Sequence, residues 1–451
     1  SSKAKIIDDI NVKFDFNWQV NKNHSIKSGF QYSNYTIDNK WRQIRNEYFG
    51  TAEENLIYKP KVFPDSTLYA DIYTVKPTEL AAYFQDKMEF DDMVINFGLR
   101  YDLFDPNSDF PSERRNPNNQ LALPDSMMST YPKADPQVQI SPRFGLAYQL
   151  GGAAVLHFSY GHFFQMPPMY SLYENHSFLV APSDYSTLMG NSELKAEKTI
   201  TYEVGLWQEL TEGMGLEVSL FYRDIYNLLS TRIISTFNQI EYGLYSNKDY
   251  GNARGLEVKL DYNSGFISSW INYTLQYTRG NADNPTQTFS RSGASMDPVN
   301  RFIPMSCDQR HTFNATVAYN KPIYGVSLTG YYNSGSPYTF SPIEESILSR
   351  VNLYPNNDYR PTKYHADLMA YYNLSISKKY KINFRLAVYN LFDRLNENSV
   401  DSKTGRAYTA VIKDTDRAGH RSNFNEFEDR IQNPAMFAAP RMIKFSTGIN
   451  F

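Results

Sequence analysis

The last twelve residues, PRMIKFSTGINF at 440–451, alternate strictly between apolar and polar side chains, and this constrains the fold more than any other feature of the chain. The apolar set is Ile443, Phe445, Thr447, Ile449 and Phe451, and the polar set is Lys444, Ser446, Gly448 and Asn450. Because successive side chains of a strand point to opposite faces, the stretch predicts a β-strand with one apolar face. That face packs either into a soluble core or against membrane lipid, and in the second case the polar face lines a lumen.

The same alternation recurs along the chain in pairs of segments joined by a few turn residues. The first pair is 12–20 and 26–32, around the turn NKNH. The later pairs are 80–90 with 94–104, 139–150 with 154–164, 199–210 with 214–228, 250–262 with 265–278, 311–319 with 325–338, and 363–376 with 382–392. Each pair is followed by a loop, and the longest loops are expected at 38–76, 105–138 and 393–439. With the final strand this predicts about fifteen antiparallel strands, with short turns at one end and long loops at the other.

Strand length and charge favour lipid over a soluble core. Many of the expected strands exceed ten residues, whereas strands of globular proteins cluster near five or six and a tilted membrane strand needs about nine to eleven. The polar faces carry full charges within the strands, at Lys13, Asp15, Arg100, Arg143, Glu203, Glu217, Arg223, Glu257, Lys259 and Arg385. Asp86 falls on an apolar face near a turn, so we expect it at the membrane interface or at a β-bulge. The sequence predicts an all-β transmembrane antiparallel barrel.

Composition agrees and excludes several classes of protein. Mean hydropathy is -0.53, which excludes a bundle of membrane-spanning helices, and aromatic residues make up 15% of the chain, as two interfacial belts require. The net charge of -3 gives no reason to expect nucleic acid as a partner. The lone Cys307 cannot form an intramolecular disulfide.

No pattern predicts an enzyme, a metal site or a cofactor. Neither a GxSxG nor an HExxH motif occurs, so we expect no catalytic residues. His157 and His162 are five positions apart on one expected strand, which places them on opposite faces and makes a shared metal ion improbable. The acidic segment at 413–430 lacks the third ligand and the closing Glu of a calcium loop, which favours a solvated loop.

Strand parity predicts that the barrel is incomplete. If the C-terminus and the short turns lie on the same, periplasmic side, the number of strands is odd, whereas a closed single-chain bacterial barrel has an even number. An open edge in lipid would leave backbone hydrogen-bonding groups unpaired. We therefore expect strands to be missing on the N-terminal side.

Nine stretches together resemble the barrel of TonB-dependent outer-membrane receptors. They are AAYFQDKMEF at 81–90, INFGLRYDLFDP at 95–106, QISPRFGLAY at 139–148, GNSELKAEKTITYEVGL at 190–206, KDYGNARGLEVKL at 248–260, DQRHTFNATVAY at 308–319, YYNSGSPYT at 331–339, YNLFDRLNENS at 389–399 and the closing PRMIKFSTGINF. HSIKSGFQY at 24–32 resembles the Bacteroidetes type, whose N-terminus carries a carboxypeptidase-regulatory-like domain. The resemblance covers nearly the whole chain.

The resemblance implies a barrel of about 22 strands filled by an N-terminal plug. Residues 1–451 would then be the C-terminal portion of that barrel, with the plug, the segment that contacts TonB and roughly seven strands absent. Those parts would be a separate polypeptide, cleaved off or unassigned. The implied partners are outer-membrane lipid and lipopolysaccharide, the TonB complex and the missing plug, and it stays open whether a surface lipoprotein caps the barrel.

The implied function is TonB-energised uptake of a scarce nutrient across the outer membrane of a Gram-negative bacterium. An adhesin or scaffold within a larger surface complex is the alternative, and an outer-membrane hydrolase is third. Candidate ligand contacts are aromatic residues in or near the expected external loops, with packing at the barrel top as the competing interpretation: Trp41, Tyr48, Tyr170, Tyr173, Tyr185, Tyr242 and Tyr245. In this family a terminal aromatic residue, here Phe451, is recognised by the barrel-assembly machinery.

Overall fold

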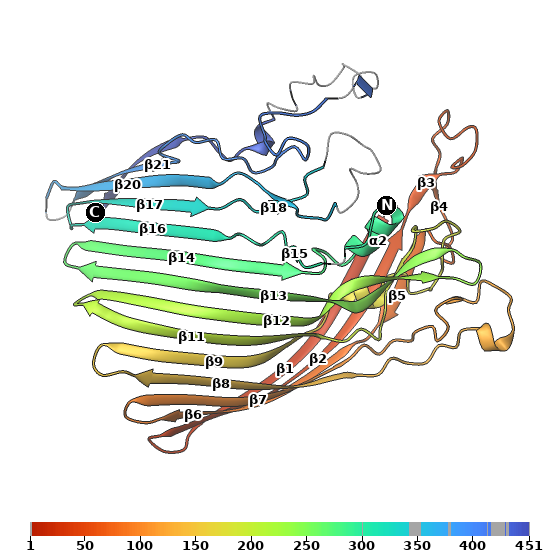
Figure 1. Cartoon of the computed structure of the whole chain (residues 1–451), viewed down its shortest axis with the longest axis horizontal. Helices are drawn as coiled ribbons and strands as arrows, with labels where there is room; N and C mark the ends of the chain where they lie inside the picture. Colours follow the sequence, from red (N-terminus) through yellow and green to blue (C-terminus); the bar gives the residue numbers. More distant parts are fainter. Residues whose placement is uncertain are drawn as a thin grey trace.

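The computed structural model describes residues 2–299, 301–341, 353–377, 380–412, 414–415, 429 and 433–450. Fifteen long strands within them follow one another in chain order around one strongly curved antiparallel sheet (Figure 1). They are β1 (Ser2–Gln19), β2 (His24–Arg42), β6 (Thr78–Glu89), β7 (Met93–Asp105), β8 (Gln137–Gln149), β9 (Ala154–Gln165), β11 (Glu197–Thr211), β12 (Met214–Ser235), β13 (Glu241–Ser264), β14 (Ile267–Gly280), β16 (His311–Asn320), β17 (Tyr324–Asn333), β20 (Lys363–Ser375), β21 (Lys381–Tyr389) and β22 (Met442–Asn450). The all-β fold and the number of strands predicted from the sequence are confirmed.

Short elements lie in the connections between these strands. The short strands are β3 (Ile44–Asn46), β4 (Pro60–Val62), β5 (Ala70–Val75), β10 (Leu188–Met189), β15 (Ile303–Pro304), β18 (Pro337–Tyr338) and β19 (Asp358–Tyr359). The helices are α1 (Met169–Tyr173) and α2 (Gln287–Gly293), with single 3-10 turns at η1 (Asp125–Met127) and η3 (Pro434–Met436). In the described part of the chain, no helix has the length and apolar character needed to cross a membrane.

Seven tight hairpin turns gather at one end of the sheet, at the left of Figure 1, and the long connections gather at the other. The turns are two to five residues long. Between β13 and β14 the turn is Gly265–Phe266, and Gly265 has a φ of +59°. The sequence analysis placed this turn two residues too early, at 263–264; glycine takes the positive φ without strain, so the chain reverses there.

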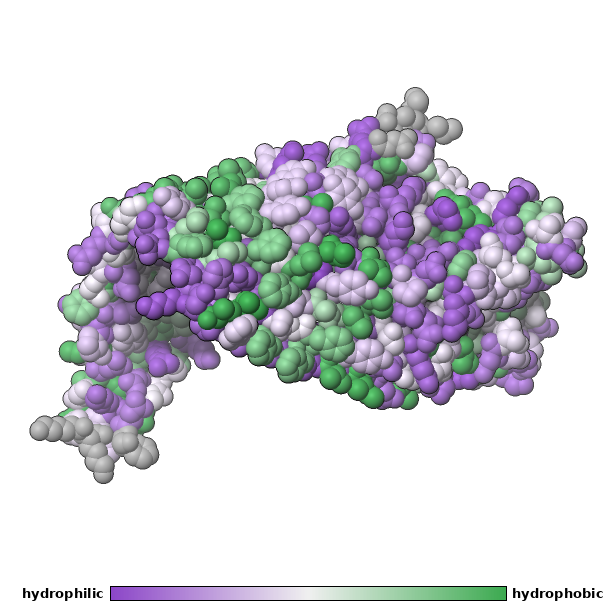
Figure 2. All heavy atoms as spheres, turned by 90° about the horizontal axis from the view of Figure 1, so that it is seen from below, coloured by the Kyte–Doolittle hydropathy of each residue, from purple (hydrophilic) through white to green (hydrophobic). Residues whose placement is uncertain are grey.

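The two faces of the wall differ as the alternation predicted. The outward face is apolar, and hydrophobic side chains gather over the left and middle of the wall in Figure 2, whereas hydrophilic side chains dominate the loop end at the right. The inward face carries charges that pair with one another across short distances. These pairs are Lys13 with Asp15 at 2.9 Å, Arg100 with Asp102 at 2.8 Å and Lys259 with Glu217 at 3.5 Å. A water-filled lumen explains why full charges lie in the middle of long strands.

Asp86 is the exception on the outward face, and the structure assigns it to the interface. Its Oδ2 lies 2.8 Å from Nδ1 of His24, which follows the first hairpin turn. Register is regular along both neighbours of β6 at this point, so the expected alternative of a bulge is wrong. The pair sits at the turn end of the wall, where polar groups meet headgroups and water.

Two expected loops contain stretches of strand that the sequence did not predict. β2 continues to Arg42 and pairs with β5, so the connection expected at 38–76 begins and ends in paired strand. No long loop follows β12, because β12 and β13 stay paired up to Ser235 and Glu241 and are joined by residues 236–240 alone. This long hairpin extends well past the neighbouring strand β11. The sequence did not predict this hairpin, because residues 229–249 mix polar and apolar types. A strand that lies outside lipid does not need one wholly apolar face.

The sheet has two free edges in the described residues. β1 pairs only with β2, and β22 pairs only with β21.

A charge on the outward face should destabilise the barrel, and Leu220 tests this. Leu220 is 55% exposed and lies six residues from the start of β12, which corresponds to a height of roughly 15 Å, near the middle of the apolar band. We expect Leu220→Lys to cost about 2–4 kcal/mol in denaturant unfolding from bilayers. Glu203→Lys, on the lumen side of the neighbouring β11, is the control. An equal loss in both variants would contradict the assignment of the two faces.

Candidate functional site

The candidate site is a pocket of about 650 Å³ at the loop end of the wall. Lys3 and Lys5 of β1 and Asn39 and Trp41 of β2 form one side, and strand register pairs them across the two strands. The opposite side comes from the connection between β9 and β11, which folds back over the lumen-facing surface, and from Tyr245 of β13. Segments far apart in the sequence therefore meet at the mouth of the barrel.

A buried cluster holds this connection in place. Tyr73 of β5, Phe104 of β7 and Tyr173 of α1 are among its members, and Tyr173 is 1% exposed. The hydroxyl of Tyr173 donates a 2.8 Å hydrogen bond to the carbonyl of Pro106. The ring of His176 lies 5.4 Å from that of Tyr73. Tyr73, Phe104 and Tyr173 come from three different elements, β5, β7 and α1, and pack together. This buried cluster forms the floor of the pocket.

Two carboxylates lie against the pocket, and burial raises the pKa of both. Asp71 accepts backbone hydrogen bonds from Asn175 at 3.2 Å and His176 at 3.1 Å, which partly oppose the shift. Glu174 accepts a hydrogen bond from the hydroxyl of Tyr245 at 3.2 Å. Desolvation raises the pKa of Glu174 most, the charge of Asp71 adds to this, and Lys3 opposes it. The pocket thus sets two carboxyl groups of raised pKa opposite two lysines.

The structure brings three of the seven predicted aromatic residues together, namely Trp41, Tyr170 and Tyr245. Tyr170 is 45% exposed and its ring meets that of Tyr245 edge-on at 5.8 Å. These two residues lie on α1 and β13, and no local pattern in the sequence predicts that they are adjacent.

The other four aromatic candidates lie elsewhere. Tyr173 belongs to the buried floor, and Tyr242 lies on β13, fully buried, with its hydroxyl donating to the carbonyl of Arg114 at 2.6 Å. Tyr185 packs against Phe289 of α2, and Tyr48 lies in the connection after β3. Tyr242 and Tyr245 both lie on β13, in the extended β12–β13 hairpin, so the loop expected after residue 228 is a strand at these two positions. Phe451 and most of the acidic segment at 413–430 lie outside the described residues.

Sequence reasoning missed Lys3, Lys5, Asp71 and Glu174. An aspartate or lysine near a strand end is common, and only the folding of the β9–β11 connection over the wall brings these charges together.

The described residues contain no group of three or more potential ligands that could hold a metal ion. His157 and His162 have separate neighbours: His157 lies 4.0 Å from Glu203, and His162 lies 2.6 Å from the hydroxyl of Tyr160.

The sequence of residues 5–391 matches the family described as TonB dependent receptor-like, beta-barrel. This region is most of the chain and contains thirteen of the fifteen long strands in full, most of β1, and every residue of the pocket lining except Lys3. The chain belongs to the TonB-dependent receptor β-barrel family. Members of this family reside in the outer membrane of Gram-negative bacteria, and this receptor barrel is accordingly an outer-membrane protein.

Solved structures show the same fold at low sequence identity. The siderophore receptor PirA from Acinetobacter baumannii matches 99% of this chain with 14% identity and a TM-score of 0.59. The FrpB iron transporter from Neisseria meningitidis matches 87% with 16% identity and a TM-score of 0.55, and the outer membrane transporter YddB from Escherichia coli matches 88% with 11% identity and a TM-score of 0.61. The receptor barrel spans about half of each of these chains: 55%, 51% and 52%. A search of curated proteins found no match.

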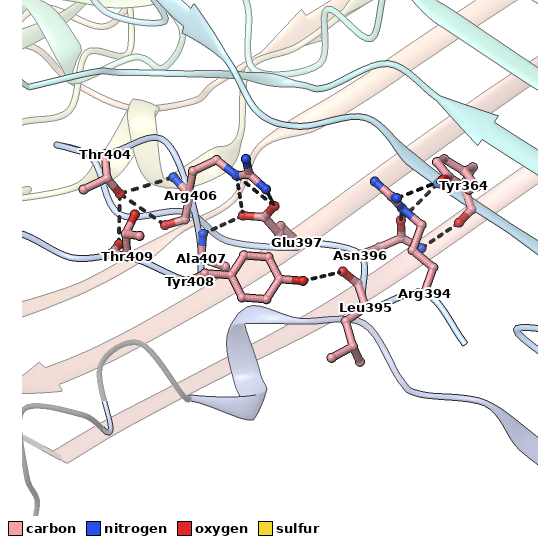
Figure 3. A network of polar contacts seen from close by, with 10 residues as sticks. All are labelled: Tyr364, Arg394, Leu395, Asn396, Glu397, Thr404, Arg406, Ala407, Tyr408 and Thr409. Atoms are coloured by element: carbon pink, nitrogen blue, oxygen red, sulfur yellow. Dashed lines mark hydrogen bonds and ion pairs between the residues drawn. The ribbon is translucent and has the colours of Figure 1, made fainter. Parts of the chain in front are cut away.

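A second ordered region of the receptor barrel lies in the connection between β21 and β22 (Figure 3). Glu397 is 5% exposed and receives a two-pronged contact from the guanidinium of Arg406, with Nη2 and Nε at 2.8 and 3.1 Å from Oε1. Arg394 lies over the ring of Tyr364 at 4.0 Å and donates to its hydroxyl at 2.8 Å. These bonds fix the connection to the start of β20.

The raised pKa of Glu174 predicts that its segment is more stable at low pH. A raised folded-state pKa favours the protonated acid, so the stabilisation is complete below the ordinary pKa of Glu, about 4.3, and is lost as pH rises through the raised value. We expect backbone amides of residues 170–176, corrected for intrinsic rates, to exchange more slowly at about pH 4 than at about pH 8. Glu174→Gln combined with Asp71→Asn should remove the difference. Unchanged pH dependence in that variant would contradict the assignment.

Gly190 should be needed for the same segment to pack. A Cβ at this position would lie 2.7 Å from the backbone nitrogen of Glu174 and 2.8 Å from the carbonyl of Leu172, and backbone atoms cannot move aside cheaply. We expect Gly190→Ala to destabilise the local packing by about 1–3 kcal/mol and to expose residues 166–196 to protease. Gly330→Ala is the control, because nothing lies within 4 Å of its Cβ position. Equal cleavage of the two variants would contradict the prediction.

Proposed function

We propose that this chain forms the wall of a receptor that takes up a scarce nutrient across the outer membrane. The supporting observation is the pocket at the loop end of the wall, where Trp41, Tyr170 and Tyr245 meet two carboxylates and two lysines. The loop end faces the outside if the tight turns face the periplasm, as in outer-membrane barrels generally. A ligand arriving from the medium would therefore reach the pocket first.

The chemistry of the pocket supports a polar ligand of moderate size. A volume of about 650 Å³ is within the range of small-molecule sites. The rings of Trp41 and Tyr170 provide flat apolar surface, while Glu174 and Asp71 offer acceptors and Lys3 and Lys5 offer donors. Such a set suits a molecule that carries both cationic and anionic groups around an aromatic or amide framework. Structures with this fold include an iron transporter and a siderophore receptor, but at 14–16% identity they support the fold and leave the cargo to this local chemistry.

Energy for release would come from the inner membrane through TonB acting on a plug in the lumen. In this proposal residues 1–451 are the C-terminal portion of the barrel, and a plug and further strands, on the same or a separate chain, complete it. The unpaired outer edges of β1 and β22 support this, as does the span of about half of the matched receptors. The paired charges of the inward face are suitable for contact with a polar plug. Membership of the Bacteroidetes type and a surface lipoprotein over the mouth stay predictions.

The aromatic candidates divide by role in this proposal. Trp41, Tyr170 and Tyr245 contact the ligand, and Tyr173 and Tyr242 support the pocket through the buried packing around them. Tyr48 and Tyr185 belong to surfaces that a larger ligand would reach. Phe451 serves as the signal for barrel assembly.

Uptake measurements test the function. Cells with and without the receptor would be supplied with a panel of ferric catecholate, cobalamin, short peptides and oligosaccharides, and depletion from the medium followed with and without a protonophore. We expect receptor-dependent depletion of one class that the protonophore abolishes. For that class, Trp41→Ala and Tyr170→Ala should each raise the half-saturating concentration about tenfold, because a buried aromatic contact contributes about 1–2 kcal/mol.

Tyr58→Ala is the matched control, since Tyr58 is 72% exposed in the connection after β3 and lies outside the pocket. Equal effects of the three variants would contradict the pocket assignment. Surface binding without depletion would favour the adhesin or scaffold, and turnover of a panel member by the receptor purified in detergent would favour a hydrolase.

A further inference from the structure

The outward face of the receptor barrel carries an arginine where neighbouring positions are aromatic or apolar. Arg254 of β13 is in register with Tyr222 of β12 on one side and Tyr277 of β14 on the other. Toward the turn the same face of β13 continues with Leu256, Val258 and Leu260. Because side chains alternate along the strand, Arg254 shares the lipid-facing side with these residues. An arginine here requires an explanation, since charge on this face is costly within the apolar band.

The height of Arg254 places it at the outer rim of that band. It lies ten residues before Ser264, the last residue of β13. Ten residues span about 33 Å along a strand, or roughly 25 Å in height at the usual tilt, which equals the height of the apolar band. The guanidinium therefore reaches the level of the headgroups in the outer leaflet.

A second arginine on the same face lies diagonally across from it. Arg279 is two positions beyond Tyr277 on β14, opposite Asn252. Diagonal neighbours of a sheet are about 7–8 Å apart, within reach of two long side chains. The described contacts join neither arginine to a carboxylate; Arg254 lies 5.8 Å from the ring centre of Tyr277. Two like charges so close favour an anion between them.

The surrounding charges leave a cationic surplus. Arg310 lies over the ring of Tyr277 at 4.0 Å, but Asp308 is 3.2 Å from it and compensates its charge. Asp224, opposite Asn252 on β12, accepts a hydrogen bond from Tyr250. Lys198 of β11 lies on the same face beyond Asp224, opposite Tyr226. Four cations and two carboxylates occupy this part of the rim.

We propose that Arg254 and Arg279 bind the phosphate of a lipid headgroup in the outer leaflet. A guanidinium presents parallel N–H donors that match phosphate oxygens, and two of them can hold one phosphate from both sides. The apolar residues toward the turn provide a surface along which the acyl chains of the same lipid lie. Free phosphate lacks this second contact, so the site selects a phosphorylated lipid.

Lipid retention by the intact receptor tests the proposal. The receptor, purified from outer membranes and washed free of lipid in detergent, would be incubated with phosphorylated lipid A, with the same lipid after removal of its phosphates, or with inorganic phosphate. Native mass spectrometry then counts bound molecules. We expect the phosphorylated lipid alone to be retained, and Arg254→Gln with Arg279→Gln to weaken its retention about thirtyfold.

Arg223→Gln is the matched control, because Arg223 adjoins Tyr222 but faces the lumen, over the ring of Phe221 at 5.2 Å. This variant should retain lipid as the wild type does. Heat-modifiable migration in gels confirms that each variant is folded. Equal retention of the dephosphorylated lipid, equal binding of inorganic phosphate, or equal loss in the lumen control would each overturn the proposal.

Discussion

The constraint on which this structure depends is that a strand in hydrocarbon must satisfy its backbone hydrogen bonds within the sheet, because lipid offers none. Thirteen of the fifteen long strands have long partners on both sides, and the ladders run without long interruption through the part of the wall that lies in lipid. The side chains are then free to serve two solvents. Apolar residues meet lipid and paired charges meet water, which is why alternation is the dominant signal in the sequence.

The loop end lies outside lipid, so its strands and connections pack against one another instead of against acyl chains. There the extended β12–β13 hairpin, the β9–β11 connection and β5 bury aromatic rings among themselves and form a small core of soluble type above the wall. The candidate pocket lies between this core and the lumen-facing surface of β1 and β2. The rigid wall thus positions a mouth whose chemistry is set by connections, and those connections are where members of a receptor family can differ without disturbing the barrel.

The strands of the wall could be predicted from the alternation of apolar and polar residues. The arrangement of the connections at the loop end could not. The strands above the membrane, such as 229–235 and 241–249, mix polar and apolar residues on each face, so their sequence predicts a loop. The meeting of Trp41 with Tyr170 depends on how a connection folds over the wall, and no local pattern encodes this. Asp71 and Glu174 look like ordinary surface acids until tertiary packing desolvates them. Strand parity follows from connectivity alone, and its expectation of further strands on the N-terminal side stays a prediction.

The short turns have a consequence for the order of assembly. Eight of the fourteen pairings between long strands join neighbours in the chain through turns of two to five residues, so the entropy of closing a long loop is a small burden for these eight. Within these hairpins, each new strand can pair with the strand that precedes it in the chain. The other six are made across much longer connections. Within the described residues, the outer edges of β1 and β22 are the ladder edges that no hairpin satisfies, so the backbone groups along these two edges are the ones that lipid would leave without hydrogen bonds.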